Sequence, residues 1–401
     1  MLCFGFAMFD RFAITNLSPF IMKDLDMSNA QLGQLMSVFA IAWAISGFFV
    51  SIVSDVTKNK KRLLMFIVIL FSAFSFLTGL AKNFAMLIGI RFVMGLFEGP
   101  ILPIAEAFSL AQSSERRRGL NMGLISTTST GLIGNLLGPI LLVALCEIFQ
   151  WRITFFLTII PGLIVAALIY KVLQEPDMTA VTGAAARDVK PSFKDSLIIF
   201  KNRNVRTSMA FGIFIMIWNV GTLTFAPVYL VSAKGFSPTE MSYIMAAAGL
   251  GAVVWGMLVP SLSDRFGRRP IVIIFSLLSV ISPLGLMGAN SGVVIAVILF
   301  IGWSGSGVFA LHQGAIIGES VDTKYASTAM ASAQMTGELG GCVVGVAIAG
   351  IIADAYGLHT TMAYTACCAA VAGFIAFAYY ETAPLVLAKR KGAEQKTIIS
   401  P

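Results

Sequence analysis

The feature that most constrains this chain is an apolar stretch, residues 83–110, that contains three ionisable side chains. The stretch is longer than the roughly 20 residues that a transmembrane helix needs. It carries Arg91, Glu98 and Glu106, and one such charge at mid-membrane costs on the order of 3 kcal/mol. Because these three fall on one face at about 100° per residue, that face is predicted to line a polar cavity and to avoid lipid.

The rest of the chain has the same apolar character. Of its 401 residues, 57% are hydrophobic and 12% are charged, whereas a soluble protein has about a quarter charged residues. The apolar runs are continuous and do not alternate, which excludes a membrane β-barrel. The sequence therefore predicts an all-α membrane protein with twelve spanning helices. The predicted spans are residues 1–22, 31–53, 63–81, 83–110, 119–149, 152–173, 205–231, 238–262, 271–289, 293–318, 326–353 and 360–380.

The basic residues predict how these helices are oriented. The chain has 28 Lys and Arg residues. With the N-terminus in the cytoplasm, two of the 28 lie within spans and four lie on the outer side, which leaves 22 on the cytoplasmic side. The positive-inside rule then places both termini in the cytoplasm. This distribution also accounts for the net charge of +8 without a nucleic-acid partner.

One long polar interval divides the chain into two sets of six helices. We predict an N-terminal bundle over 1–173, a cytoplasmic linker over 174–204, a C-terminal bundle over 205–381 and a cytoplasmic tail over 382–401. Asp55 follows the second span and Asp264 follows the eighth, so the halves have the pattern of an internal repeat. Transporters built from such repeats bind substrate where the repeats meet.

Several motifs resemble those of the major facilitator superfamily. Residues 264–269 read Asp-Arg-Phe-Gly-Arg-Arg and resemble its signature loop, of which residues 55–62 are a degraded copy. Residues 134–139, Gly-Asn-Leu-Leu-Gly-Pro, resemble the motif of its fifth helix, and Glu319 to Asp322 resemble the end of its tenth. The resemblance implies twelve helices in two six-helix halves that work by alternating access.

A narrower resemblance is carried by two segments with buried charges. Asp10-Arg11 and residues 91–100, Arg-Phe-Val-Met-Gly-Leu-Phe-Glu-Gly-Pro, are similar to the organic anion:cation symporters. That family includes bacterial importers of sugar acids and the vesicular glutamate and sialic acid carriers. The resemblance implies that Arg11 and Arg91 line the anion site, and that Asp10 and Glu98 take part in proton coupling.

Depth in the membrane supports a meeting of these charges. Asp10 and Arg11 lie about 14 Å into the first helix, and Arg91 and Glu98 approach mid-membrane from the other face. An Arg guanidinium binds a carboxylate at two points. We expect ionised Asp10 and Glu98 to pair with Arg11 and Arg91, and protonation to free the arginines for substrate. Static ion pairs that hold the helices together are the alternative reading.

Other polar residues within spans are weaker candidates. Asn135, Asn219, Trp303 and Gln334 are predicted to contact substrate, with hydrogen bonding between helices as the alternative. Glu338 departs from the pattern of the symporter family, and is read as a second proton site or a structural partner. A conformational gate is predicted from the loop residues, namely Asp55, Asp264, Arg265 and Arg268.

These features predict a secondary transporter in the cell membrane, most simply a bacterial inner membrane. It is expected to be a monomer. It is expected to take up a small organic anion, such as a sugar acid, together with protons, and Na⁺ is the alternative coupling ion. The sequence has no catalytic constellation, so an enzyme, a cofactor and a metal are not expected. The rivals are a proton-driven exporter of amphipathic compounds and a transporter-like receptor.

Overall fold

The computed structural model describes residues 1–56, 59–112, 121, 124–175 and 197–388, and a few helical residues, Asp55 among them, by backbone alone. Its secondary structure is helical. The first half contains α1 (Leu2–Asn16), α2 (Ser18–Asp24), α3 (Asn29–Val56), α4 (Lys60–Thr78), α5 (Phe84–Glu98), α6 (Ile101–Gln112), η2 (Leu124–Thr128), η3 (Thr130–Leu137), α8 (Gly138–Leu157) and α9 (Ile159–Val172).

The second half repeats this helical character with more interruptions. It contains η4 (Leu197–Lys201), α12 (Arg203–Val228), η5 (Tyr229–Ala233), α13 (Pro238–Phe266), α14 (Arg268–Leu278), α15 (Ile281–Gly288), α16 (Gly292–Gly302), η6 (Trp303–Val308), η7 (Leu311–Ala315), α17 (Ile316–Ser320), α18 (Thr323–Gly337), η8 (Glu338–Gly345), α19 (Val346–Tyr356) and α20 (Leu358–Ala376). Of the predicted linker, residues 176–196 lie outside the described residues, as do residues 389–401 of the predicted tail.

The helices account for the twelve predicted spans. Ten ranges of the described chain are long and apolar enough to cross a membrane. One of them, Thr130–Val172, has 43 residues, about twice what a bilayer needs, and it turns at Gln150, where φ is 69°. It is therefore two spans. The first span is not among the ten because it is broken at Leu17 into α1 and α2.

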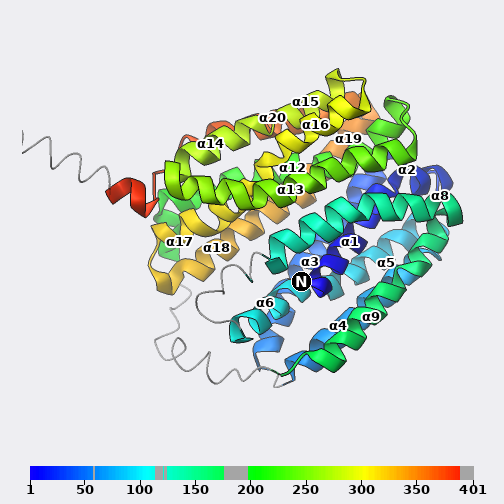
Figure 1. Cartoon of the computed structure of the whole chain (residues 1–401), viewed down its shortest axis with the longest axis horizontal. Helices are drawn as coiled ribbons and strands as arrows, with labels where there is room; N and C mark the ends of the chain where they lie inside the picture. Colours follow the sequence, from blue (N-terminus) through cyan, green and yellow to red (C-terminus); the bar gives the residue numbers. More distant parts are fainter. Residues whose placement is uncertain (57–58, 113–120, 122–123, 176–196, 389–401) are drawn as a thin grey trace, which may run out of the picture.

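The two halves form two bundles that meet along their length (Figure 1). In the figure the N-terminal bundle runs from blue to teal and the C-terminal bundle from green to orange. Two groups of helices make the largest contacts between them. In one group α3 packs against η8 and α19, and in the other α13 packs against η3 and α8. The space between these two contacts is where the repeats face one another.

Hydrogen bonds join the halves at one end, which we call the closed end. There the Asp354 carboxylate accepts hydrogen bonds from the backbone N–H groups of Asn29 (2.8 Å) and Ala30 (2.9 Å). On the other side of the molecule, Thr239 donates to the carboxylate of Glu147. A further bond, from Ser37 Oγ to the carbonyl of Val343 (2.7 Å), lies two turns deeper. The closed end is thus fixed at both inter-bundle contacts.

The internal repeat is visible in how two equivalent helices begin. Glu175 accepts hydrogen bonds from the backbone N–H groups of Lys60 (2.6 Å) and Lys61 (3.0 Å) at the start of α4. Glu381 does the same for Arg268 (2.7 Å) and Arg269 (3.2 Å) at the start of α14. A carboxylate at a helix N-terminus satisfies N–H groups that have no partner within the helix. Both halves therefore use the acid that follows their sixth helix to cap their third.

Glycine allows α3 and α5 to pack closely. A Cβ atom on Gly95 would lie 2.8 Å from the carbonyl oxygen of Phe39, so no larger residue fits there. Small residues allow such close approach of membrane helices, because backbones rather than side chains then make the contact. As a result the Phe39 side chain of α3 comes next to Arg91 of α5.

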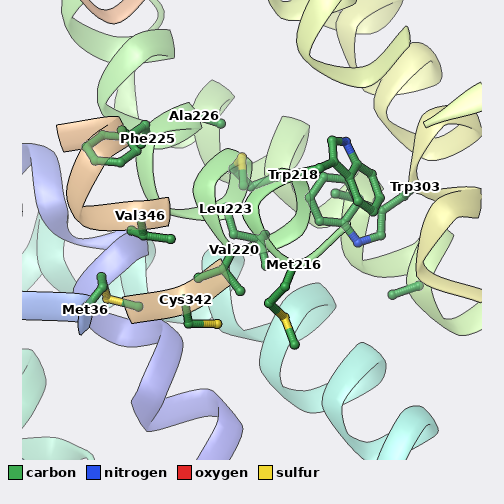
Figure 2. Packing of buried hydrophobic residues seen from close by; sticks show 14 of the residues in the cluster. Met36, Met216, Trp218, Val220, Leu223, Phe225, Ala226, Trp303, Cys342 and Val346 are labelled. Carbon is green, nitrogen blue, oxygen red and sulfur yellow. The ribbon is translucent and has the colours of Figure 1, made fainter. Parts of the chain in front are cut away.

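The buried core of the second half is rich in large aromatic residues. Figure 2 shows Trp218 of α12 beside Trp303 of η6, with Met216 nearby. The two indole rings are 5.2 Å apart between centroids and tilted by 44°, and Trp218 Nε1 donates to Ser282 Oγ at 2.9 Å. Such pairs favour offset or tilted geometry. The pair fixes the wall of the second half where it faces the first.

Candidate functional site

A cavity of about 270 Å³ lies between the two halves. This is near the lower end of the range for small-molecule sites, roughly 300–1,000 Å³, so it suits a small solute. It extends from mid-span, where Asn135 lies, toward the first turn of α1, where Phe4 lies. Six of the predicted site residues line it, namely Arg11, Asn135, Asn219, Trp303, Gln334 and Glu338.

The walls of this cavity include several segments that depart from regular α geometry. Asn135 lies in the π-helical segment η3, Trp303 in the 3₁₀ segment η6, and Glu338 begins the π-helical segment η8. Departures of this kind are frequent at functional sites because they redirect side chains and loosen the backbone hydrogen-bond ladder. With Gln313 of the π-helical segment η7, four such segments contribute to the wall of this cavity.

Arg11 is the positively charged residue of the cavity wall. It is 8% exposed, and its guanidinium carbon lies 5.3 Å from the ring centroid of Phe39 and 5.4 Å from that of Trp43. Both distances are within the range of cation–π attraction. Its Nε atom has no hydrogen-bond partner in the described part of the chain. A guanidinium held by aromatic rings in this way keeps donors available for an anion.

Arg91 does not line this cavity, although the sequence predicted that it would stand beside Arg11. It is fully buried behind α1. Its guanidinium donates to the backbone carbonyls of Asp10 (3.5 Å) and Arg11 (3.1 Å), and to Met94 Sδ (3.2 Å). Its carbon lies 4.6 Å from the same Phe39 ring that Arg11 contacts. The side chain thus holds the backbone of α1 at the point from which Arg11 projects.

The two carboxyl groups of this region have very different surroundings. Asp10 points away from the cavity, and its Oδ1 accepts a hydrogen bond from Ser75 Oγ (2.6 Å), which in turn pairs with Thr158 Oγ1 (2.8 Å). Glu98 is 1% exposed, and neither of its oxygens has a partner among the residues that the structure describes. Asp10 is therefore satisfied by hydroxyl groups, whereas Glu98 is a buried carboxyl group without a donor.

The expected ion pairs between these carboxylates and the arginines do not form in this conformation. The structure describes the side chains of all four residues and has no pair of their charged atoms within 4.0 Å. The reason is geometric: Arg91 is occupied by backbone carbonyls, while Asp10 and Arg11 project from different faces of α1. The four charges share one region of the N-terminal bundle, but they are not joined directly.

Two of the four predicted gate residues, Asp264 and Arg268, belong to a network at the end opposite the closed end. Arg268 pairs with Asp264 (2.5 Å) and with Glu319 (2.9 Å), and it also donates to Ser263 Oγ (2.6 Å). Arg265 is exposed, and Asp55 is described by backbone alone. The network joins α13, α14 and α17 of the second half to one another.

Two functional neighbours were missed by sequence reasoning. Phe39 and Trp43 form the aromatic surface under Arg11, and both lie on α3. Their spacing of four residues places them on one helix face, which was a usable signal. The sequence does not predict which charged residue these rings face, because that depends on how α1 packs against α3.

Comparisons with known proteins agree with this architecture. The sequence profile of the Major Facilitator Superfamily matches residues 1–343 and 209–401. The hexuronate transporter of Bacillus subtilis (strain 168) is 28% identical over 371 residues, which are 87% of this chain and 85% of the relative. The multidrug resistance protein MdtL of Escherichia coli O81 (strain ED1a) is 28% identical over 239 residues, 59% of this chain and 58% of the relative.

A solved structure gives the same result for the fold. The crystal structure of a bacterial homologue of the human lysosomal transporter Spinster, inward-facing and unoccupied, matches with a TM-score of 0.75. The match covers 94% of each chain at 18% identity, so it supports the arrangement of helices and says nothing about substrate.

Proposed function

This chain belongs to the Major Facilitator Superfamily, and from that premise we propose that it imports a small organic anion together with protons. The fold and the family make it a multi-pass secondary transporter and not an enzyme. The single observation that carries the choice of cargo is Arg11. This buried guanidinium lines the cavity between the halves, and its Nε has no partner in the described chain.

A carboxylate is the cargo that fits this group best. Arg offers a planar fork that binds a carboxylate through two parallel hydrogen bonds. Asn135, Asn219 and Gln334 add neutral amides to the same walls, and such groups suit the hydroxyls of a sugar acid. The similarity to a hexuronate transporter supports this class of cargo. In this proposal Arg91 is a positioning residue that acts through the backbone of α1.

Proton coupling is assigned to Asp10 and Glu98. A buried ionised carboxylate without a donor or counter-ion is costly in an apolar environment. Proton uptake at Glu98 removes this free-energy cost. Asp10 has hydroxyl partners that suit both of its protonation states, since a hydroxyl can donate or accept. When these acids are neutral, Arg11 is the basic residue of the cavity that a substrate carboxylate can reach. Cargo and proton would therefore move together.

The conformation is proposed to be inward-facing. The basic residues favour cytoplasmic termini, which makes the closed end the external one. The cavity extends toward the start of α1, which would then be the cytoplasmic side. The Asp264–Arg268–Glu319 network lies on that side, and we propose that it acts as a latch. The same orientation corresponds to import across a bacterial inner membrane by a monomer.

Efflux of amphipathic compounds is the second candidate, and the similarity to a multidrug resistance protein favours it. The apolar part of the cavity wall, which includes Trp303 and Phe309, would also accept such compounds. A buried arginine argues against it, because a cationic or neutral cargo leaves that guanidinium uncompensated, at a cost of several kcal/mol.

The test is uptake of a labelled hexuronate by proteoliposomes under an inward proton gradient. We expect gradient-driven accumulation, and we expect Arg11→Gln to weaken substrate affinity by roughly 10- to 100-fold, the value of a charge-assisted hydrogen bond. Arg206→Gln, at an exposed position of α12, is the matched control. Extrusion of a lipophilic cation with no carboxylate uptake would favour the efflux candidate instead.

A further inference from the structure

The central cavity has one charged residue on each of its two walls. Arg11 projects from α1 of the first half, and Glu338 begins η8 of the second half. They are the two charged residues among the described residues that line the cavity. The remaining lining residues are apolar, aromatic, hydroxyl-bearing or amide-bearing. The cavity therefore has a basic residue on the wall of the first half and an acidic residue on the wall of the second half.

These two charges face one space without touching. No guanidinium nitrogen of Arg11 lies within 4.0 Å of a carboxylate oxygen of Glu338, since the ion pairs of the described side chains are elsewhere. Both residues are more than nine-tenths buried. Arg11 Nε and Glu338 Oε2 each lack a hydrogen-bond partner in the described chain. A basic and an acidic residue, each with a polar atom that lacks a partner, therefore border the same cavity of about 270 Å³.

A cargo with a single negative charge satisfies only half of this arrangement. Its carboxylate would pair with Arg11 and would leave Glu338 buried opposite an uncharged part of the ligand. A buried charge that stays without a partner is costly in an apolar environment. A ligand with an ammonium group as well as a carboxylate would give each wall its counter-charge. Such a ligand adds no net charge to the cavity.

We infer that the natural substrate is a small amino acid or amino sugar acid, whose carboxylate binds Arg11 and whose ammonium group binds Glu338. An ammonium group has three rotatable donors and no acceptor, which matches a carboxylate that only accepts. This inference rests on the proposed function, because it keeps Arg11 as the carboxylate site. It adds a cation subsite that plain carboxylates do not use.

The competing role for Glu338 is that of a second proton site. In that case a protonated Glu338 would be neutral beside a plain carboxylate, and an ammonium group would bring no advantage. The two roles predict different results for a pair of ligands that differ by the amino group: a preference for the amino ligand in one case and no such preference in the other. Ligand pairs therefore separate them more directly than any single substrate.

The experiment measures calorimetric binding of matched pairs to the purified full-length protein. The pairs are gluconate with 2-amino-2-deoxygluconate, propionate with 3-aminopropionate, and butyrate with 4-aminobutyrate. The range of spacings is needed because the ligand must match the gap between the two walls. We expect at least one amino ligand to bind ten times more tightly than its partner, and Glu338→Gln to remove that difference.

Controls make the outcomes distinguishable. Glu106→Gln changes a half-buried acid of α6 that does not line the cavity, and it should leave the preference intact. Arg11→Gln should weaken both members of each pair. If plain carboxylates bind and no pair shows a preference that depends on Glu338, this inference is wrong while the proposed function stands. If neither kind of carboxylate binds the unaltered protein, both are wrong.

Discussion

The two halves of the chain keep their buried charges in different places. In the first half Asp10 and Arg11 of α1 and Arg91 and Glu98 of α5 are all buried inside the bundle. In the second half the largest charged network, around Arg268, is at the end of the bundle, and Glu338 is the charged residue of the cavity wall. Trp218 and Trp303 occupy the interior instead.

This difference indicates that the two halves, although they are structural repeats, have different functions. Both halves cap their third helix with an equivalent acid, Glu175 or Glu381. Among the described residues, a cluster of four buried charges lies in the first half, where each costs free energy unless it is compensated. The first half is thus suited to handle protons and anions, and the second to shape the cavity and supply its acidic residue, Glu338. The following predictions test whether the two halves differ in this way.

The largest effect is expected from Asp10→Asn. An asparagine can still accept the hydrogen bond from Ser75 (2.6 Å), but it cannot take up a proton. We expect loss of accumulation under a proton gradient in proteoliposomes, with substrate exchange retained. Asp26→Asn, at an exposed residue with φ of 48° that asparagine tolerates, is the control. Full accumulation by Asp10→Asn would remove this acid from the coupling step.

The next largest effect is expected from Arg91→Gln. Removing the guanidinium takes hydrogen bonds from the backbone carbonyls of Asp10 and Arg11, and we expect a loss of affinity of roughly 10- to 100-fold. Because this residue does not touch the cavity, the loss should be similar for every ligand that binds. An effect that depends on the ligand's carboxylate, measured by calorimetry, would show that Arg91 contacts substrate directly in another conformation.

A smaller effect is expected from Phe39→Leu. The change keeps most of the apolar volume but removes the ring that both guanidiniums contact, at 5.3 Å and 4.6 Å. A buried cation–π contact is worth about 1–2 kcal/mol, which corresponds to a loss of affinity of roughly 5- to 30-fold. Phe309→Leu, on the cavity wall of the second half, should cost less because no cation–π contact of the described residues involves it. Equal losses of affinity in the two variants would contradict a specific role of the first half in anion binding.

The smallest effect on binding is expected from Arg268→Gln. Its partners are Asp264, Glu319 and Ser263 at the end of the second bundle, so substrate affinity should stay within about twofold. Thermal stability should fall by the equivalent of about 1–3 kcal/mol, because hydrogen-bonded charges lose their partner. The exposed Arg265→Gln is the control, and a scan of unfolding temperature is the measurement. A large loss of affinity would place this network in the binding step.

Much of the fold could be predicted from the sequence, because long apolar runs in a membrane have few alternatives to a helix. The twelve spans and the order of the two halves follow from hydropathy alone. The depth of Arg11 in the first helix was predictable from the rise per residue. The orientation of Arg91 was not, because a helical wheel gives the faces of one helix and does not say which neighbour covers each face.

The sequence by itself determined that this chain is a membrane-embedded bundle with costly charges in its core, since composition and apolar run length leave no other folded state. Only the tertiary structure decided that Arg11 faces the cavity, that Arg91 holds the backbone behind it, and that Glu338 stands on the opposite wall. The physical reason is that charges far apart in the chain interact through space. Their distances depend on how α1, α3 and η8 pack, which local patterns do not encode.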